Sequence, residues 1–433
     1  MLVNFRFKNN RSFYNENDLS MQATSDDEMK ELNTFSVDEK LLSKDNELLK
    51  SAVIFGSNAS GKSNVIKALS YMWTVVAYSA AEQSNVVRAN EVFAFYEDAV
   101  NEDSLYEVEL VANKTYYQYG FKINKGFIVE EWLNKRNERL TKVFYRSKDS
   151  IEITGLNKNS TNLIKISDYS LFLSIGNNYK LTIADDINNV LNWFKNLLIV
   201  FENNNNSFDI YNVENKKYLN QALKILKKAD IGIQDIEVVK DKLADLRNLN
   251  EVLNFNTQLQ IDPRRFVGQK KQEQQTLYNI DVKTQFSVYN KENKVVGKKD
   301  VMLLKDGYFN SEGTVRLLNY LGWILAALDK GMVIFIDEID AKLHFLVADY
   351  LIKMFNSIDK NPNNAQLVCT AHNVMLMDED LRRDQIYFTS KDNIGVSTLV
   401  SLADYKNVRK TNLFSKRYLS GFYAKLPNLK KKV

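Results

Sequence analysis

The chain has 433 residues, 45% of them hydrophobic and 26% charged, which is enough for one large or two modest globular domains. Its 58 basic and 54 acidic residues nearly balance, so the overall charge gives no general attraction to nucleic acid. A single cysteine, Cys369, excludes an internal disulfide, and with only two histidines we expect no structural zinc site. The N-terminal residues are polar and charged, and every apolar run is far shorter than the roughly 20 residues that span a membrane. We therefore expect a cytoplasmic protein with no membrane association.

The first third of the chain predicts strands around one glycine-rich loop. Residues 2–13 alternate apolar and polar side chains, which predicts an opening strand. Residues 51–55 form a short apolar run typical of a buried strand, and helical periodicity follows over residues 64–76. Alternating aromatic and aliphatic residues over 104–133, broken by two Asn-Lys turns, predict an antiparallel β-meander.

In the rest of the chain, some segments have a clear secondary-structure pattern and others do not. Residues 183–200 and 214–229 have helical spacing. Residues 230–300 mix a helical pattern with two expected strands and a Gln- and Lys-rich run at 268–275, which favours a solvated loop. From residue 311 onward the pattern is helix, strand, helix, strand, which predicts a parallel sheet.

These patterns predict an α/β fold in three parts. Residues 1–150 form an N-terminal lobe with the glycine-rich loop and an antiparallel β subdomain. Residues 151–300 form an inserted, mainly helical region, and residues 301–433 form a C-terminal lobe.

The strongest motif is G-x-x-x-x-G-K-S, placed between the expected strand and helix. Glycines let the backbone wrap closely around a phosphate, and the helix N-terminus adds partial positive charge. Lys62 has the reach to contact the β- and γ-phosphates, and the Ser63 hydroxyl is a magnesium ligand in such loops. The motif therefore predicts ATP and Mg²⁺ as cofactors. The expected nucleotide contacts are Gly56, Ser57, Asn58, Ala59, Ser60, Gly61, Lys62, Ser63 and Asn64.

The second motif is an apolar run at 332–336 followed by two acids. The run predicts a buried central strand that places Asp337 beside the phosphates as an outer magnesium ligand. Glu338 is then positioned to polarise the attacking water. Apolar strands that end in acids are common, so this motif indicates a nucleotide site only in combination with the phosphate loop.

Two further segments resemble parts of ABC-type ATPases. Ser311 and Gly313 open a helix 26 residues before Asp337 and resemble the signature motif that caps the γ-phosphate held by the opposite subunit. The match is loose, because Asn310 replaces the usual leucine. His372 ends an apolar strand and looks like the switch histidine that contacts the γ-phosphate, although a lone histidine is more often structural.

Together these motifs are similar to the SMC, RecF and OLD-like branch of ABC ATPases over about 60% of the chain. The resemblance implies a P-loop ATPase head that dimerises head to tail around ATP, as a homodimer or higher homo-oligomer. It places Asp340 in the loop that faces the partner protomer. It also implies that the turn at residues 9–13 approaches the phosphates, with Arg11 as the contact; a solvated turn is the alternative. His344 is expected on a helix face.

Finer features resemble the AbiL/RloA group of bacterial ATPases, which includes the ATPase of the PARIS system. The segments that carry this likeness are residues 337–344, 311–314, 382–387 and 417–424. The group occurs in phage-defence and abortive-infection operons. The resemblance implies a sensor or scaffold that works with a separately encoded effector, such as a nuclease or toxin.

Two departures from the ABC pattern matter. A Q-loop glutamine is missing: Gln83 comes too early, and residues 90–95 occupy the expected position without a glutamine. Hydrolysis is therefore expected to be slow. Only 61 residues follow His372, too few for the C-terminal nuclease domain of the OLD proteins.

Two other functions stay open at this point. The first is a DNA-repair or chromosome-associated ATPase, which would need a basic strip; candidates are Arg264-Arg265, Lys270-Lys271 and residues 430–432. The absence of sustained heptads weighs against it. The second is a transporter head, which normally requires an intact Q-loop.

Overall fold

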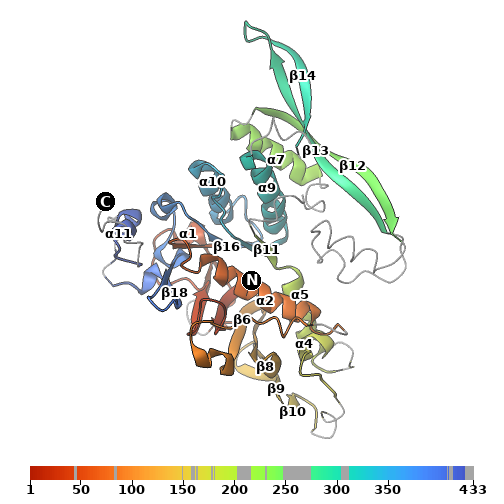
Figure 1. Cartoon of the computed structure of the whole chain (residues 1–433), viewed down its shortest axis with the longest axis vertical. Coiled ribbons are helices and arrows are strands. Elements are labelled where there is room, and N and C mark those ends of the chain that lie inside the picture. Colours follow the sequence, from red (N-terminus) through yellow and green to blue (C-terminus); the bar gives the residue numbers. More distant parts are fainter. Residues whose placement is uncertain are drawn as a thin grey trace. The chain divides into compact units, whose positions relative to one another are not determined.

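A computed structural model of the chain describes residues 1–42, 46–81, 85–148, 150–157, 161, 164–176, 179, 181–201, 216–229, 232–246, 275–303, 312–406, 408 and 413–424. The chain divides into two compact units (Figure 1). The first combines Met1–Phe201 with Ala327–Val433, and the second is Glu202–Ala326.

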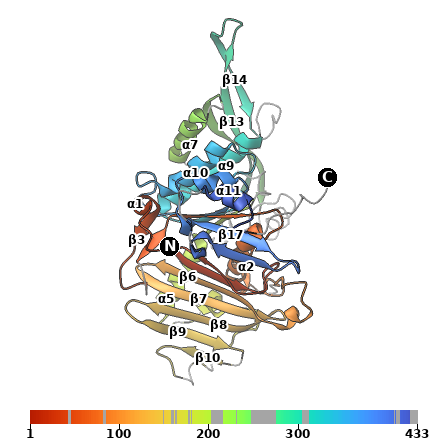
Figure 2. The same ribbon diagram turned by 90° about the vertical axis from the view of Figure 1, so that its left-hand side faces the viewer.

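The first unit contains a seven-stranded antiparallel sheet in the order β10-β9-β8-β7-β6-β1-β2 (Figure 2). Consecutive hairpins connect β6 to β10, and β1 joins the edge of this meander, so the expected β subdomain is present and longer than predicted. The turns after β6 and β7 place Asn113, Lys114, Lys125 and Gly126 at positive φ, as tight hairpins require. The strands are β1 (Leu2–Lys8), β2 (Asn17–Ser20), β6 (Ser104–Ala112), β7 (Thr115–Asn124), β8 (Phe127–Arg136), β9 (Leu140–Ser147) and β10 (Ser150–Ile153).

A second, six-stranded sheet in the same unit has the order β11-β15-β16-β5-β17-β18. Its first five strands are parallel and only β18 is antiparallel, which confirms the expected parallel sheet. Parallel neighbours bring the carboxyl ends of β5, β15 and β16 to one edge. The strands are β5 (Ser51–Gly56), β11 (Leu198–Val200), β15 (Val333–Ile336), β16 (Gln366–Thr370), β17 (Ile386–Lys391) and β18 (Ser397–Ser401).

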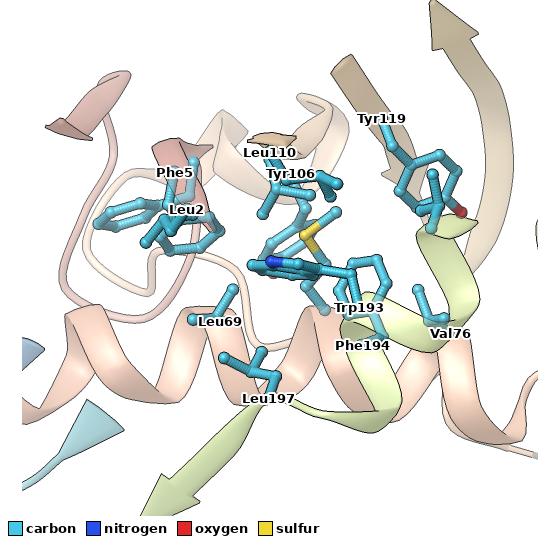
Figure 3. Packing of buried hydrophobic residues seen from close by; sticks show 14 of the residues in the cluster. Leu2, Phe5, Leu69, Val76, Tyr106, Leu110, Tyr119, Trp193, Phe194 and Leu197 are labelled. Atoms are coloured by element: carbon cyan, nitrogen blue, oxygen red, sulfur yellow. The ribbon is translucent and has the colours of Figure 1, made fainter. Parts of the chain in front are cut away.

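Helix α2 (Lys62–Tyr78) lies between the two sheets and contacts both β5 and β6. Its buried stripe includes Leu69 and Val76, which pack in one hydrophobic core with Leu2 and Phe5 of β1 (Figure 3). Trp193 of α5 (Ala184–Lys195) belongs to the same core. This shared core holds the start of α2, and therefore the glycine-rich loop, firmly in place.

Shorter elements complete the first unit. Helix α10 packs on β5 and β16, and α11 packs on the 3₁₀ turn η5. These elements are α1 (Lys30–Asn33), β3 (Thr34–Ser36), β4 (Glu47–Leu49), η1 (Glu97–Asn101), α4 (Phe172–Ile175), α10 (Phe345–Asn356), η5 (Val374–Asp378), η6 (Arg383–Gln385), η7 (Leu402–Asp404) and α11 (Phe414–Leu419). Among the described residues, no helix combines the length and apolar character that crossing a bilayer requires.

The second unit is built on a three-stranded antiparallel sheet in the order β12-β13-β14. Its strands are long, and every residue from 288 to 300 is exposed, so the β13–β14 hairpin ends in solvent (Figure 1). The elements are α7 (Lys216–Lys228), β12 (Ile233–Leu246), β13 (Gln275–Tyr289), β14 (Val295–Met302) and α9 (Glu312–Lys330), whose last four residues belong to the first unit.

Several predictions about elements need correction. The expected helix over 183–200 ends at Lys195, because the apolar run after it forms β11 beside β15. The region expected to be mainly helical contains the β12–β14 sheet, where cross-strand pairing overrides a charged, helix-like pattern. The expected boundaries at 150 and 300 fall within β10 and β14. Residues 268–274, expected as a loop, lie outside the described residues.

Candidate nucleotide-binding site

The glycine-rich loop joins β5 to α2 and depends on two glycines. A Cβ atom at Gly56 would lie 2.3 Å from Thr389 Oγ1 and 2.4 Å from Ser60 Oγ, so no larger residue fits there. Gly61 has φ +115°, a conformation that side-chain-bearing residues rarely adopt. Ala59 also has a positive φ, of 61°. The backbone of the loop therefore curves tightly just before α2. The N-terminus of that helix carries partial positive charge and attracts anions.

Lys62 is buried, with 5% of its surface exposed. Its Nζ donates hydrogen bonds to two backbone carbonyls of the loop, those of Gly56 (2.7 Å) and Ser57 (3.2 Å). Burial lowers the pKa of Lys62 because the charged form loses water, although Glu338, Asp337 and Asp340 act in the opposite direction. The ammonium group is thus held within the loop, where a phosphate group could replace the carbonyl contacts.

Asp337 lies at the end of β15, directly opposite the loop. Its Oδ1 accepts hydrogen bonds from Ser63 Oγ (3.0 Å) and Thr370 Oγ1 (2.7 Å). Ser63 comes from the first turn of α2, and Thr370 ends β16, the strand between β15 and β5. Three adjacent elements therefore converge on one carboxylate.

Glu338 and His372 form a pair beside this carboxylate. His372 Nε2 lies 3.2 Å from Glu338 Oε1, and their side chains are 41% and 26% exposed. Glu338 has φ 54°, and its backbone N–H donates to Thr370 Oγ1 (2.7 Å). A partly exposed carboxylate that lies beside a histidine and a phosphate loop is suited to accept a proton from water.

Asp340 organises the backbone that carries His372. Its Oδ2 accepts hydrogen bonds from the N–H groups of His372 (2.8 Å) and Asn373 (2.5 Å). His344, which we expected on a helix face, instead caps α10: its Nδ1 accepts a hydrogen bond from the N–H of Leu346 (3.3 Å).

Four hydroxyl residues that the sequence patterns did not single out support the site. Besides Thr370, they are Ser12, Thr389 and Ser397. Ser397 Oγ donates to the carbonyl of Ser60 (2.7 Å), and Thr389 Oγ1 lies 2.6 Å from Ser60 Oγ. Ser12 Oγ accepts from Asn64 Nδ2 (2.8 Å) and lies 2.8 Å from Ser397 Oγ. No local pattern marks Thr389 and Ser397, because their position follows from β17 lying beside β5 and β18 beside β17.

The turn at residues 9–13 follows β1 and does not continue the strand. Within it, Ser12 contacts the glycine-rich loop, whereas Arg11 forms an ion pair with Glu91 (2.9 Å). Arg11 has φ 52°, and its backbone N–H donates to the carbonyl of Glu91 (2.7 Å). Residues 90–95, which replace the missing Q-loop glutamine, thus pack on this turn.

Gly313 lies in the first turn of α9, whereas Ser311 lies outside the described residues. The same holds for Gln83 and for the three candidate basic segments, which are Arg264-Arg265, Lys270-Lys271 and residues 430–432.

The donor set beside the loop suits a magnesium ion. Ser63 and Asp337 present a hydroxyl and a carboxylate within 3.0 Å of each other, and hard oxygen ligands are what Mg²⁺ prefers. Among the described residues, no three His, Cys, Asp or Glu side chains are grouped to hold a metal by themselves. This fits an ion that takes most of its ligands from nucleotide phosphates and water.

A phosphate loop after a buried parallel strand, with an acidic pair and a histidine at the ends of the two next strands, is the arrangement of an ABC-type P-loop nucleotide-binding fold. The chain belongs to the family described as "AAA domain, putative AbiEii toxin, Type IV TA system", whose model matches residues 51–378.

Several solved structures are similar in fold. The Smc head bound to the C-winged helix domain of ScpA has 14% identity and a TM-score of 0.44, covering 92% of this chain and 97% of that one. Smc heads from Pyrococcus furiosus, bound to the C-terminal domain of ScpA, and from Pyrococcus yayanosii each have 11% identity, with TM-scores of 0.39 and 0.37. Each covers 92% of this chain and 96% of its own. No curated protein matches the sequence.

Proposed function

We propose that the protein binds ATP with Mg²⁺ at the Gly56–Asn64 loop and hydrolyses it. The observation that carries this proposal is that four side chains, which come from separate elements, meet in one cluster. They are Ser63, Asp337, Glu338 and His372, and Thr370 contacts both acids. Family membership supports nucleotide binding, since the family is one of AAA domains.

In this proposal each residue has a defined task. Lys62 exchanges its contacts with the loop carbonyls for the β- and γ-phosphates, and the N-terminus of α2 adds its partial positive charge. Ser63 and Asp337 hold Mg²⁺, which when bound offsets the negative charge of the phosphates. Glu338 accepts a proton from the attacking water, and His372 orients Glu338.

We further propose that the active form is a head-to-tail dimer. Glu338 and His372 are partly open to solvent in the single chain, and phosphoryl transfer benefits from exclusion of bulk water. A second copy would cover them, with the segment that carries Ser311 and Gly313 capping the γ-phosphate. Asp340, beside His372, would lie at the same boundary.

The biological role we propose is that of an ATP-dependent sensor or scaffold in antiphage defence, acting with a separately encoded effector. The family description, which refers to a toxin of a type IV toxin–antitoxin system, and the resemblance to the AbiL/RloA group both support this role. ATP would hold the dimer closed, and hydrolysis would release or activate the effector.

Two substitutions test the proposal. Lys62→Ala should weaken ATP binding by roughly 100-fold or more, because charge-assisted hydrogen bonds to phosphate are lost. Glu338→Gln should retain ATP binding but lower turnover by about 10²- to 10⁴-fold, since the general base is removed. Equilibrium binding, steady-state hydrolysis and light scattering should then show an ATP-trapped Glu338→Gln dimer. Used as bait, this dimer should retain the effector encoded by a neighbouring gene, and Lys62→Ala should not.

The matched control is Glu292→Gln, which makes the same chemical change on an exposed side chain of the second unit. It should bind and hydrolyse ATP like the wild type. Wild-type turnover by Glu338→Gln would show that another residue is the base. An effector retained equally by both site variants would refute the ATP-dependent scaffold.

A further inference from the structure

Strand β14 is an open edge of the sheet in the second unit (Figure 1). It is last in the order β12-β13-β14, so among the described residues only β13 pairs with it. Residues 295–300, six of its eight, are all exposed. An edge strand presents a row of backbone groups without partners, and proteins commonly cover such a row or keep the strand short. β14 is therefore open to pairing with another chain.

The register shows which backbone groups of β14 point outward. The N–H of Leu303 donates to the carbonyl of Val282 (2.8 Å), in a register that continues along the hairpin to residue 297. Hydrogen-bonded and non-bonded pairs alternate along an antiparallel ladder. The odd-numbered residues from 297 to 301 therefore direct their N–H and C=O groups towards β13. Lys298 and Asp300 lie between them, so their backbone groups point away from the sheet.

The open edge is positively charged. Residues 291–300 contain four lysines and two acids, a net charge of +2. Both acids have partners: Asp300 accepts a hydrogen bond from Gln285 Nε2 (3.0 Å), and Glu292 forms an ion pair with a neighbouring lysine (2.9 Å). Among the described residues, Lys298 forms no ion pair.

This charge selects what can pair with β14. Pairing between two copies of β14 would bring two positively charged strands together, and like charges across strands are destabilising. Lysines on an edge deter pairing with most chains for the same reason. They attract an acidic strand.

The end of the β13–β14 hairpin adds apolar surface on a preformed support. Tyr289, Val295 and Val296 are 57%, 59% and 62% exposed. The turn between the strands is well bonded, because Asn290 Oδ1 accepts hydrogen bonds from the N–H groups two and four residues later (2.9 Å each). A partner that binds this hairpin therefore does not have to order it first.

We propose that β14 accepts an added strand from the separately encoded effector, through an extended segment that combines acidic and apolar residues. This inference rests on the proposed function, because that function supplies the partner. The outward backbone groups of Lys298 and Asp300 bond the added strand, and the ammonium group of Lys298 attracts its acidic side chain. The apolar side chains at the end of the hairpin cover its apolar ones. Main-chain bonds thus give affinity, and Lys298 gives selectivity.

Substitutions at Lys298 test the added strand. Lys298→Pro removes the outward N–H and leaves the bonds to β13 in place, since an edge strand tolerates proline where its N–H faces solvent. Each change is made in the Glu338→Gln chain, which is immobilised with ATP, and binding of the purified product of the neighbouring gene is measured by biolayer interferometry. Lys298→Pro should weaken this binding at least about tenfold.

Two further variants separate the backbone from the charge. Lys298→Glu keeps the N–H and should weaken binding about 3- to 30-fold, because it reverses the charge across the strands. Lys298→Arg is the matched control and should bind within about threefold of the parent chain. Made in the wild-type chain, all three should hydrolyse ATP at the wild-type rate, because the change lies outside the nucleotide site.

Residue-resolved hydrogen exchange reports the added strand directly. In the free chain the amide of Lys298 should exchange faster than that of Lys299, which faces β13. Binding of the effector should slow exchange at Lys298 and Asp300. Slower exchange there on raising the concentration of this chain alone would show self-pairing and overturn the inference.

The outcomes separate this inference from the proposed function. If Lys298→Pro and Lys298→Glu both bind the effector as tightly as the parent Glu338→Gln chain, the docking strand is wrong and the proposed function stands. If the Glu338→Gln chain itself retains no effector, the scaffold role is refuted and this inference falls with it.

Discussion

At the scale of single residues, Thr370 is the residue through which the site is held together. Its hydroxyl donates to Asp337 and accepts the N–H of Glu338, so one side chain sets the position of both acids. Glu338 has a left-handed backbone conformation, which costs a non-glycine residue about 1 kcal/mol or more. The hydrogen bond to Thr370 offsets part of that cost and keeps the carboxylate near His372.

Thr370→Val tests this role, because valine keeps the shape and removes the hydroxyl. The N–H of Glu338 would lose its partner, which costs about 1–3 kcal/mol of folding free energy in a buried setting. We expect kcat to fall about 10- to 100-fold as both acids shift, with ATP affinity in the absence of magnesium changed little.

Thr284→Val provides the control for Thr370→Val. Thr284 is also fully buried, and its hydroxyl donates to the carbonyl of Val301 (3.0 Å) in the second unit. This variant should lose stability in a similar range while its kcat stays at the wild-type value. Unchanged kcat in Thr370→Val would show that Thr370 only stabilises the fold.

The sequence predicted part of this site and missed the rest for a physical reason. Lys62, Ser63 and Asp337 belong to motifs whose spacing along the chain is itself the signal. Thr370 and Ser397 contact the site only because β16 and β18 occupy particular places in the sheet. Strand order cannot be derived from local patterns, so residues that depend on it carry no sequence signal.

At the scale of elements, the alternating pattern after residue 311 predicted the parallel sheet, and the Asn-Lys turns predicted the meander. The long strands of the second unit were harder to predict from the sequence. β12 mixes lysines and acids with scattered aliphatic residues, and its pairing with β13 over most of its length decides its structure. Likewise, β11 is only three residues long and is a strand because β15 lies beside it.

Close packing inside the meander gives a prediction at this scale. A Cβ atom at Gly120 in β7 would lie 2.5 Å from the ring of Trp132 and 2.9 Å from the carbonyl of Tyr106. Gly120→Ala should therefore lower the free energy of unfolding by about 1–3 kcal/mol, because the backbone on one side cannot move away. Urea denaturation followed by circular dichroism measures this loss.

Gly297→Ala is the natural comparison for Gly120→Ala. Gly297 also lies in a strand, β14, but nothing is within 4 Å of the added methyl group. Alanine there should be neutral or stabilise by up to about 1 kcal/mol, since it restricts the unfolded chain. Equal effects of the two substitutions would contradict the packing argument.

At the scale of the whole molecule, the proposed dimer makes each site depend on two chains. In this arrangement Lys62 belongs to one protomer and Ser311 to the other. Lys62→Ala and Ser311→Arg homodimers should both be inactive. A mixed dimer would have one doubly defective site and one intact site.

Mixing the two inactive variants should therefore restore activity. At equal amounts we expect about a quarter of wild-type turnover, because half of the dimers are mixed and each has one working site. Mixing Lys62→Ala with the Lys62→Ala/Ser311→Arg double variant should restore nothing. The absence of recovery in the first mixture, with heterodimers present, would refute the composite site.

The position of β5 also has a consequence for how the protein is made. Its two neighbours in the sheet, β16 and β17, are encoded about 300 residues later. At cellular elongation rates this gap lasts roughly 15–60 s, during which an apolar strand and the phosphate loop emerge without their partners. The meander of β6–β10, by contrast, is assembled from adjacent segments and can fold early. In a nascent chain the antiparallel sheet can therefore form well before the two strands that flank β5 have been made.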